Sequence, residues 1–367
     1  MQTGAIADIA GVVDNCDKAL SDAEKQAGVD ARDVVIGIAG ELVKGMTSTV
    51  SLKRPQPDKH LDVEELEHII KRVQDRALQN ARQRLAYEMG QKEVDVRLVN
   101  SALVSIEIDG YKVTNPVGFQ GREIAIQLFT AFAPMIHIGA LERVAEELDL
   151  DVLAVAAEPF AVARSVIGTD ASSNLSAILV DVGGGTTDIA VVNEGGVEGT
   201  KMFGIGGRSF TRTVSNELGV TFETAEGMKL HVGSGRLAKE EEAKVTGALD
   251  KTLDVWISGV ELALSEFADL DHLPNRILLC GGGASLEQLV GTLKDSGWSK
   301  ELPFTKPPSV QHIAPEQVVG IVDKTGRIHD HTYITAMGLL RVGLDTVTAV
   351  EDTPGSVRDR LNKLLSI

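Results

Sequence analysis

The spacing of hydrophobic residues near the start of the chain changes from helical to extended. Apolar side chains first recur at intervals of three to four residues, at Ile6, Ile9, Val13, Cys16 and Leu20. This spacing predicts a helix over residues 6–27 with Gly28 as its C-cap. The continuous apolar run of residues 34–39 follows, and such a run is typical of a strand that is buried on both faces. The chain therefore begins with a helix and then a strand of the parallel-sheet type.

Residues 50–132 have a different pattern, which predicts a small α+β unit of its own. Asp62 and Glu65 form a capping box. The helix predicted after this box has its apolar residues on one face, at Leu66, Ile69, Ile70, Val73 and Ala77. Hydrophobic residues then alternate with polar ones, which indicates strands, and Asp109 with Gly110 predicts a hairpin turn between two of them.

In the rest of the chain, buried strands alternate with helices. Strands are predicted at residues 152–157, 176–182, 189–193 and 277–280, and helices at residues 134–148, at 158–166 and within 220–271. Ser285 and Gln288 form a second capping box, which predicts the start of a further helix. This alternation predicts an α/β protein with helices on both faces of its sheet.

Composition and charge favour a protein of several domains without a nucleic-acid partner. The chain has 367 residues, which favours two or more domains. Its net charge of −17 would repel the phosphates of nucleic acid, so we expect no nucleic-acid partner. The sequence has no run of 18 apolar residues that could span a membrane. Cys16 and Cys280 lack the spacing of a metal site and are interpreted as small buried hydrophobes in a reducing cytosol.

The segment of residues 181–188 carries the strongest chemical signal. A predicted strand ends near Asp181, and a turn leads into the next strand through Gly183, Gly184, Gly185, Thr186 and Thr187. Glycines let backbone amides approach phosphate oxygens, the threonines add hydroxyl donors, and Asp181 is placed to hold Mg²⁺ through water. The turn joins two strands, so neither the dinucleotide fingerprint nor the P-loop fits. A plain hairpin turn would not require an acidic residue on each side, and we therefore predict a phosphate-binding hairpin.

Three further motifs each have a functional and a structural interpretation. A second glycine run, Gly281, Gly282 and Gly283, ends a predicted strand just before Ser285. It forms either a ligand site or an ordinary βα loop. Glu158 precedes a proline and either faces the ligand crevice of an α/β sheet or simply starts a helix. Glu226 and Lys229 lie three residues apart on one helix face, and most such pairs are surface salt bridges.

Together these motifs resemble the superfamily of actin, sugar kinases and chaperone ATPases, in which two similar domains clamp a nucleotide. The resemblance implies an actin-like two-domain α/β fold with ribonuclease H-like halves, and ATP and Mg²⁺ as cofactors. Residues 181–188 look like the second phosphate loop, with Asp181 as a catalytic residue and water-mediated Mg²⁺ ligand. Glu158 looks like the catalytic residue near the metal-bound water. Glu226 and Lys229 look like the pair that reaches ribose and adenine, and the second glycine run with Ser285 looks like the adenosine loop.

Within this superfamily the chain is similar to the bacterial FtsA cell-division family. The resemblance covers nearly the whole chain and includes residues 4–8, residues 115–118 and the order of helix, strand and insert. The type IV pilus protein PilM shares the fold, and residues 158–164 are similar to its connecting segment. PilM is therefore the alternative resemblance.

The FtsA resemblance implies a division of the chain into domains. The first actin-like domain comprises residues 1–48 and 134–170, and an inserted α+β subdomain for assembly comprises residues 49–133. The core of the second actin-like domain comprises residues 171–210 and 269–342, with a helical upper subdomain at residues 211–268. A linker is expected at residues 343–355 and a tail helix at residues 356–367.

The sequence departs from the superfamily because only one phosphate hairpin can be recognised. The first hairpin normally opens the chain, whereas here Met1 stands almost directly before the first predicted helix. The strands of that hairpin would lie at the centre of the first sheet. We therefore expect that the chain starts late, through a misplaced start codon or a split gene. Half of the phosphate cradle would then be missing, so we expect ATP hydrolysis to be weak at most.

The final residues predict a short cationic amphipathic helix over residues 356–367. Its apolar face is formed by Val357, Leu361, Leu364 and Leu365. In the FtsA resemblance such a tail lies on the membrane surface, and the alternative is a helix packed back on the protein. The expected location is cytoplasmic and peripheral, on the cytoplasmic face of the cell membrane.

Three functions follow from these patterns. The FtsA resemblance implies an ATP-binding protein that self-associates into filaments and tethers the ring of an FtsZ-like tubulin homologue to the membrane. The PilM resemblance implies a pilus-assembly scaffold that binds ATP and a peptide of a membrane protein. The third alternative is a metabolic kinase, but the sequence shows no clear sugar-binding cluster.

Overall fold

A computed structural model describes residues 5–167, 175–267, 270–295 and 297–351. The strands are β1 Asp33–Ile38, β2 Lys44–Lys53, β3 Val96–Ile108, β4 Tyr111–Lys112, β5 Glu123–Pro134, β6 Asp151–Ala157, β7 Ala177–Val182, β8 Thr187–Asn193, β9 Gly196–Phe203, β10 Arg276–Cys280 and β11 Ser309–His312. The helices are α1 Ile9–Ala27, α2 Val63–Glu88, α3 Met135–Glu147, α4 Glu158–Ile167, α5 Gly207–Leu218, α6 Phe222–His231, α7 Lys239–Ser265, α8 Glu287–Lys294 and α9 Ile334–Glu351. Short 3₁₀ turns are η1 Gly282–Ser285, η2 Pro315–Gln317 and η3 His331–Tyr333.

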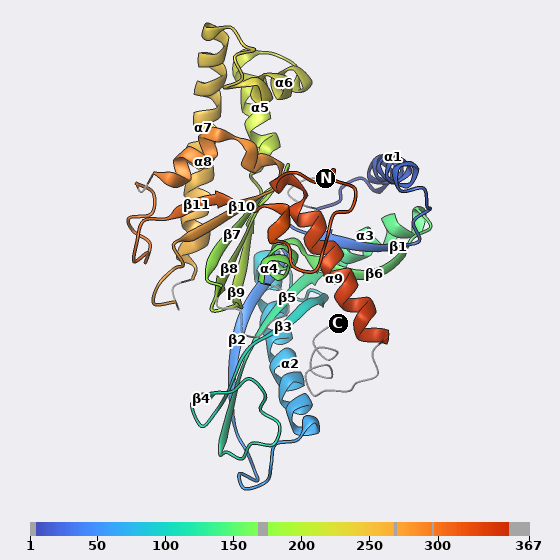
Figure 1. Ribbon diagram of the computed structural model, residues 1–367, viewed down its shortest axis with the longest axis vertical. Helices are drawn as coiled ribbons and strands as arrows, with labels where there is room; N and C mark the ends of the chain where they lie inside the picture. The colour runs from blue at the N-terminus through green and yellow to red at the C-terminus, as the bar shows by residue number, and fades with distance from the viewer. Residues whose placement is uncertain (1–4, 168–174, 268–269, 296, 352–367) are drawn as a thin grey trace.

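These strands form two sheets. β1 and β6 make a parallel pair, and nine strands form the second sheet in the order β11-β10-β7-β8-β9-β2-β5-β3-β4. β10 runs parallel to β7 and β11, whereas β7, β8 and β9 are antiparallel. Figure 1 shows α5, α6 and α7 at one end of the molecule and α2 with β2 to β5 at the other. The predicted α/β class, with helices alternating with strands, is confirmed.

The strands of residues 50–132, where the sequence predicts a small α+β unit, do not form a separate sheet. β2 pairs with β5 along its whole length, and its first residues also pair with β9, where Gly45 lies opposite Thr200. A Cβ atom at Gly45 would lie 2.0 Å from Oγ1 of Thr200, so glycine permits this junction. The strands of the insert therefore continue the sheet of β7, β8 and β9. The expected domain boundaries after residues 48 and 133 fall inside β2 and β5, and the domain division remains a proposal.

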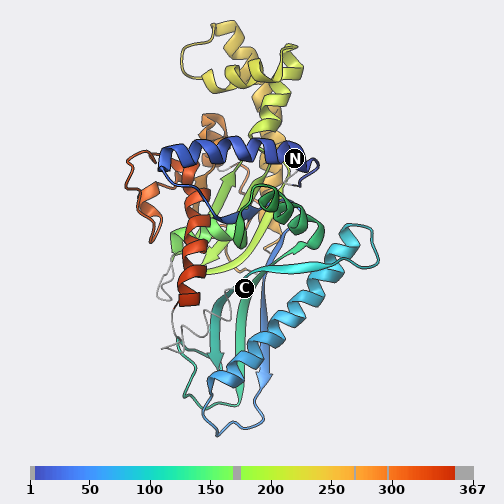
Figure 2. The same ribbon diagram turned by 90° about the vertical axis from the view of Figure 1, so that its right-hand side faces the viewer.

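Helix α2 covers one face of β2, β3 and β5 (Figure 2), and the apolar residues predicted for its inner face are all buried. Its N-cap is Asp62, whose carboxylate accepts a hydrogen bond from the Glu65 N–H at 2.9 Å. The capping box is wrong in its second half, because the Glu65 side chain pairs with Arg54 at 2.8 Å instead. Arg54 is buried and also donates to the carbonyls of Lys59 and Gly121, so this ion pair joins the helix to the sheet.

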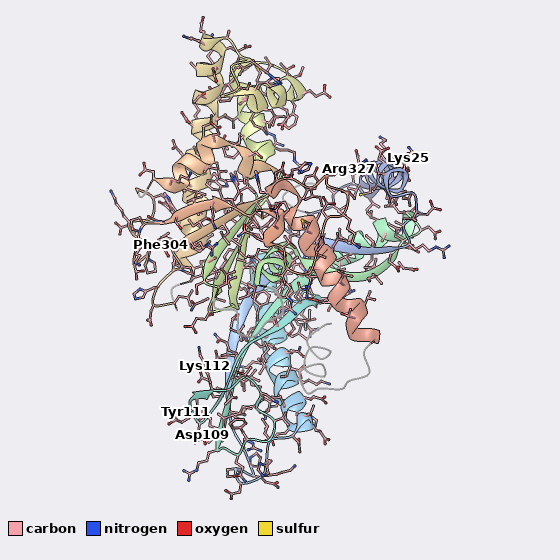
Figure 3. The ribbon with its side chains drawn as sticks, in the orientation of Figure 1. Lys25, Asp109, Tyr111, Lys112, Phe304 and Arg327 are labelled. Carbon is pink, nitrogen blue, oxygen red and sulfur yellow. The ribbon has the colours of Figure 1, made fainter. Side chains whose placement is uncertain are left out.

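The predicted hairpin turn between β3 and β4 is confirmed. Asp109 and Gly110 have φ angles of 48° and 83°, the left-handed conformation that a tight two-residue hairpin requires. Figure 3 shows Asp109, Tyr111 and Lys112 together on this hairpin. The Lys112 ammonium lies 3.1 Å from the carboxylate of Glu194, which links the hairpin to the turn between β8 and β9.

Hydrophobic clusters lie on both faces of the β7–β8–β10 region. On one face α5, α7 and α8 pack over the sheet, and the fully buried Trp256 of α7 donates its indole N–H to Oγ1 of Thr187 at 2.8 Å. On the other face α4 and α9 contribute to the core, where Phe160 stacks on Phe129 with 5.4 Å between ring centroids. The strands at the centre are buried on both sides, as their continuous apolar sequences predict.

The first helix and strand form as predicted but are less buried than expected. Helix α1 ends at Ala27, and Gly28 follows in the left-handed conformation with φ 72°. No residue of α1 is buried. In β1, predicted to be buried on both faces, only Ile38 is buried. Among the described residues β1 pairs with β6 alone, which leaves it outside the nine-stranded sheet.

Helix α9 occupies most of the segment expected to be a linker. It continues to Glu351, so the linker predicted for residues 343–355 is wrong over residues 343–351. The helix is held there because Arg341 and Arg164 of α4 both pair with Asp345. The predicted tail helix at residues 356–367 lies outside the described residues. No helix in the described ranges combines the length and the hydropathy needed to cross a membrane.

Candidate functional site

The ends of several strands bring acidic side chains together in the middle of the molecule. Glu158 is the first residue of α4 and directly follows β6. Asp181 on β7 lies opposite Asp188 on β8 in the antiparallel ladder. Cys280, the last residue of β10, is paired with Asp181 on its other side. The structure therefore brings together Glu158 and Asp181, which were both predicted as site residues.

Burial and mutual repulsion raise the pKa of these carboxylates. Burial and then the charge of Asp181 raise the pKa of Glu158 to about 7. Burial and then the charges of Glu158 and Asp181 hold the pKa of Asp188 well above its usual range. Burial also raises the pKa of Asp181, and a hydrogen bond from Thr335 opposes that shift. Oδ1 of Asp188 is buried without a hydrogen-bond partner, and no basic side chain of the described residues compensates these charges.

This set of oxygen donors fits a hard divalent cation. Buried carboxylates without a counter-charge are unfavourable, and a cation would relieve the repulsion between them. Mg²⁺ binds carboxylate oxygens and usually keeps several of its water ligands. Within the described ranges no three His, Cys, Asp or Glu side chains are arranged to hold a metal directly. Mg²⁺ would therefore be held through water by Asp181 and Asp188, with Glu158 beside it.

The glycine turn after β7 packs against the beginning of α5. The N–H groups of Gly207 and Arg208 donate to the carbonyls of Gly183 and Gly184 at 2.9 and 2.8 Å. A Cβ atom at Gly206 would lie 2.6 Å from the Gly183 carbonyl oxygen, so only glycine fits at this approach. These contacts use the carbonyl groups of the turn and fix its orientation.

Three successive amides of the turn have no acceptor in the part of the chain that the structure describes. They belong to Gly184, Gly185 and Thr186, whereas the Gly183 N–H bonds to the Thr186 carbonyl at 3.0 Å. Successive N–H groups that converge in a turn form an anion-binding concavity. The guanidinium of Arg208 reaches the same turn, because a Cβ atom at Gly185 would lie 2.8 Å from its Nη2. The turn thus offers hydrogen-bond donors and a cation to a phosphate group.

The two threonines of the turn differ in what their hydroxyls contact. The Thr186 hydroxyl donates to Oδ2 of Asp188 at 3.0 Å and lies at the carboxylates. The Thr187 hydroxyl donates to the carbonyl of Ile205 at 2.7 Å and accepts from Trp256. Thr187 is fully buried. The prediction that its hydroxyl contributes to phosphate binding is therefore wrong, because the side chain faces the core of α5 and α7.

The second glycine run packs directly on the end of β7. Gly281 has a φ of 83°, and a Cβ atom there would lie 2.1 Å from Oδ1 of Asp181. A Cβ atom at Gly283 would lie 2.5 Å from Cγ1 of Val182, whereas one at Gly282 would meet nothing within 4 Å. Two of the three predicted glycines are thus needed for the close approach of this loop to β7, Gly281 at Asp181 and Gly283 at Val182.

The capping box predicted at Ser285 is wrong. A 3₁₀ turn covers the end of the glycine run, and α8 begins only at Glu287 with Leu286 as a cap that has no side-chain hydrogen bond. Ser285 is therefore too early to cap this helix, and its hydroxyl lies 3.1 Å from Nε2 of His331. His331 stacks on His312 with 4.0 Å between centroids. Burial and then the neighbouring His312 lower the pKa of His331.

Glu226 and Lys229 form an ion pair in which Lys229 is buried and Glu226 remains partly exposed. Both lie on α6, and Lys229 is only 7% exposed. Its ammonium donates to Glu226 at 2.8 Å, to Oγ1 of Thr211 at 3.0 Å and to the carbonyl of Gly207 at 3.2 Å. A Cβ atom at Gly207 would lie 3.9 Å from Cα of Gly283. The pair is therefore adjacent to both glycine segments, and all four predicted motifs meet in one region.

The structure adds site residues that the sequence analysis missed. Thr335 near the start of α9 donates its hydroxyl to Oδ2 of Asp181. Gly37 of β1 lets that strand approach Glu158, since a Cβ atom at this glycine would lie 2.8 Å from Oε1. A glycine inside an apolar strand and the basic Arg208 directly after two glycines were usable signals. No spacing rule connects Thr335 with Asp181.

Comparison with known proteins identifies similar sequences. A family model described as Cell division protein FtsA matches residues 178–338, a stretch that includes both glycine segments. The cell division protein FtsA of Pseudomonas aeruginosa is 24% identical over 366 residues, covering 94% of this chain and 80% of that protein. FtsA of Bacillus subtilis is 22% identical over 316 residues, covering 80% of this chain and 68% of that protein.

Among solved structures, a chain of the PilM-PilN type IV pilus biogenesis complex matches with a TM-score of 0.64. The two chains are 16% identical, and the match covers 95% of this chain and 88% of the other. At this level of identity the likeness shows the fold alone. The family model and the curated relatives confirm the predicted FtsA resemblance. The chain is thus similar in sequence to the bacterial FtsA cell-division proteins and has the actin-like ATPase fold.

Proposed function

We propose that this chain binds ATP with Mg²⁺ at the region where the two glycine segments meet. The free amides of residues 184–186 and the Arg208 guanidinium would contact the phosphates. Glu226 and Lys229 would face the ribose and adenine. The observation that carries the proposal is the buried, partnerless Oδ1 of Asp188 among carboxylates of raised pKa. A cation is the missing partner that such a cluster requires.

Asp181 and Glu158 would have different tasks in this site. Asp181 would hold Mg²⁺ through water, while Glu158, with a pKa of about 7, is suited to accept a proton from a water molecule near neutral pH. Loss of Glu158 would therefore reduce ATP hydrolysis more than it reduces ATP binding. Comparing Glu158→Gln with the unchanged chain tests this: ATP turnover should fall while ATP affinity remains. A variant with full turnover would refute the role.

We further propose an FtsA-like cellular role: polymerisation, binding to an FtsZ-like tubulin homologue, and attachment to the membrane surface through residues 356–367. The naming of the curated relatives as cell-division proteins supports this role. The test is co-pelleting with FtsZ filaments on vesicles of anionic lipid. The full chain should bring FtsZ to the vesicles, and a chain without residues 356–367 should bind FtsZ but leave the vesicles bare. Equal vesicle binding by both chains would refute the anchor.

A pilus-assembly role is the second candidate, and the TM-score of 0.64 to a PilM chain over 95% of this chain supports it. In that role the chain would bind a peptide of a membrane protein instead of FtsZ. Adding a PilN-type peptide and FtsZ filaments in parallel separates the two candidates. Saturable binding of the peptide with no co-pelleting would favour the pilus role over the cell-division role.

A further inference from the structure

The hydroxyl of Thr335 contacts Asp181 across a large distance in the sequence. The two residues are 154 positions apart, and the threonine hydroxyl is the donor to Oδ2 of the carboxylate. Asp181 is buried, while Thr335 is half-buried near the start of α9. No other side-chain hydrogen bond to this carboxylate is found within the described ranges. This hydroxyl is therefore the side-chain donor that holds Oδ2 of Asp181 within the described ranges.

The opposite side of the carboxylate is also constrained. Gly281 lies so close that a Cβ atom there would be 2.1 Å from Oδ1. Oδ2 is held by Thr335 and Oδ1 is packed against the second glycine run, so the plane of the carboxylate is set from two directions. A carboxylate that must hold a cation through water needs a defined orientation, because the hydrated ion demands regular geometry.

Helix α9 is itself fixed against α4, the helix that begins with Glu158. A Cβ atom at Gly338 would lie 2.6 Å from the carbonyl oxygen of Ala161, so the two helices touch through their backbones. Arg164 of α4 and Arg341 of α9 share Asp345 as their ionic partner. The position of the Thr335 hydroxyl relative to Asp181 is therefore determined by packing and is not a flexible surface contact.

The other threonines of α9 show what an ordinary hydroxyl does on this helix. The Thr346 hydroxyl donates to the carbonyl of Val342 at 2.9 Å, and that of Thr348 donates to the carbonyl of Leu344 at 2.8 Å. Both bonds stay within the helix, the usual alternative for a helical threonine. Thr335 differs because its hydroxyl leaves the helix and contacts a buried acid of another element.

We propose that Thr335 is a positioning residue that orients Asp181 for water-mediated binding of Mg²⁺ together with ATP. The inference rests on the proposed function and adds a specific role for the start of α9. It predicts that loss of the hydroxyl weakens the response of ATP binding to Mg²⁺ but leaves ATP binding without Mg²⁺ unchanged. A hydroxyl that served only the packing of α9 would affect both equally.

The test measures the affinity of the full chain for ATP in EDTA and across a Mg²⁺ titration. Thr335→Val keeps the shape and removes the donor, Thr335→Ser keeps the donor, and Thr346→Val is the matched control on the same helix. We expect Thr335→Val to raise the half-saturating Mg²⁺ concentration about tenfold or more, as changes behind a metal ligand do. Thr335→Ser and Thr346→Val should match the unchanged chain. Thermal unfolding monitors folding, and Thr335→Ala replaces the valine variant if that variant does not fold.

An unchanged Mg²⁺ requirement in Thr335→Val or Thr335→Ala overturns the inference, and so does an equal loss of ATP affinity in EDTA. Failure of the proposed function has a different signature. In that case the unchanged chain itself shows no ATP binding, or no effect of Mg²⁺ on it, before any variant is compared.

Discussion

Asp181 of β7 lies directly opposite Asp188 of β8, and the charge of Asp181 contributes to the raised pKa of Asp188. Both side chains are buried, and Oδ1 of Asp188 has no partner. The pair therefore destabilises the cation-free protein, since each buried charge disfavours the other. A cation bound at the proposed site would offset this cost.

Replacing Asp188 by Asn should separate these two effects. Asn has nearly the same shape and no charge, so the cation-free chain at pH 7 should become more stable by about 1–3 kcal/mol. The same variant should lose stabilisation by added Mg²⁺ and ATP. Thermal unfolding with EDTA and with Mg²⁺ and ATP measures both quantities. A lower melting temperature of Asp188→Asn in EDTA would contradict this account.

Glu158 predicts a defined dependence of stability on pH. Its pKa is about 7 in the folded chain against a usual 4.5, so the folded state holds the proton over this interval while the unfolded state releases it. The free energy of unfolding should therefore fall as pH rises from about 4.5 to 7, by roughly 3 kcal/mol from this group.

The measurement is urea unfolding of the cation-free chain at several pH values. Glu158→Gln should remove this part of the pH dependence, and Glu223→Gln, at an exposed position on α6, is the control. If Glu158→Gln and Glu223→Gln give the same pH profile, Glu158 is not the responsible group.

The second glycine run offers a matched pair of substitutions. Gly281→Ala should destabilise the chain by several kcal/mol and reduce ATP binding, because φ is 83° and the new Cβ atom would lie 2.1 Å from Oδ1 of Asp181. Gly282→Ala should be well tolerated, since nothing lies within 4 Å of its Cβ position. Unfolding and ATP titration of the two variants provide the comparison. Equal effects would mean that the approach of residue 281 to Asp181 is unimportant.

Thr186 and Thr187 are neighbours but should respond differently to substitution by Val. Thr187→Val removes the acceptor of the buried Trp256 N–H and should cost about 1–3 kcal/mol of stability. Thr186→Val removes a hydroxyl that contacts Asp188 and should mainly weaken ATP binding in the presence of Mg²⁺. Unfolding free energies and ATP affinities of the two variants test whether Thr187 belongs to the core and Thr186 to the site. Similar losses of Mg²⁺-dependent ATP affinity in both variants would mean that the Thr187 hydroxyl does contribute to phosphate binding.

The local elements of this fold are readable from the sequence because their signals are local. Helix α2 follows from the Asp62 cap and the spacing of its apolar residues, and the β3–β4 turn follows from Asp109 and Gly110. The glycine segments are recognisable in the sequence, but β6, which precedes Glu158, lies outside the sheet that contains Asp181, so strand order does not bring these two residues together. Glu158 and Asp181 were assigned to one site only by the resemblance to the actin superfamily.

The features that could not be predicted depend on contacts between distant segments. The junction of β2 and β9 depends on Gly45 meeting Thr200, and the Thr335 bond to Asp181 spans 154 residues. Helix α9 continues through the segment expected to be a linker, where Arg164 and Arg341 both pair with Asp345, and Arg164 lies far from α9 in the sequence. Periodicity and capping rules describe neighbours in sequence and contain no information on such pairs.

The carboxylate cluster and the glycine turn are proposed to form one site for ATP with Mg²⁺. Calorimetric titration of the full chain with ATP, in Mg²⁺ and in EDTA, tests it most directly, with Asp181→Asn as the comparison. We expect the unchanged chain to bind ATP saturably, with an affinity that falls at least about tenfold in EDTA. The ATP affinity of the Asp181→Asn variant should no longer depend on Mg²⁺. Absence of ATP binding by the unchanged chain, or equal affinity with and without Mg²⁺, would contradict this proposal.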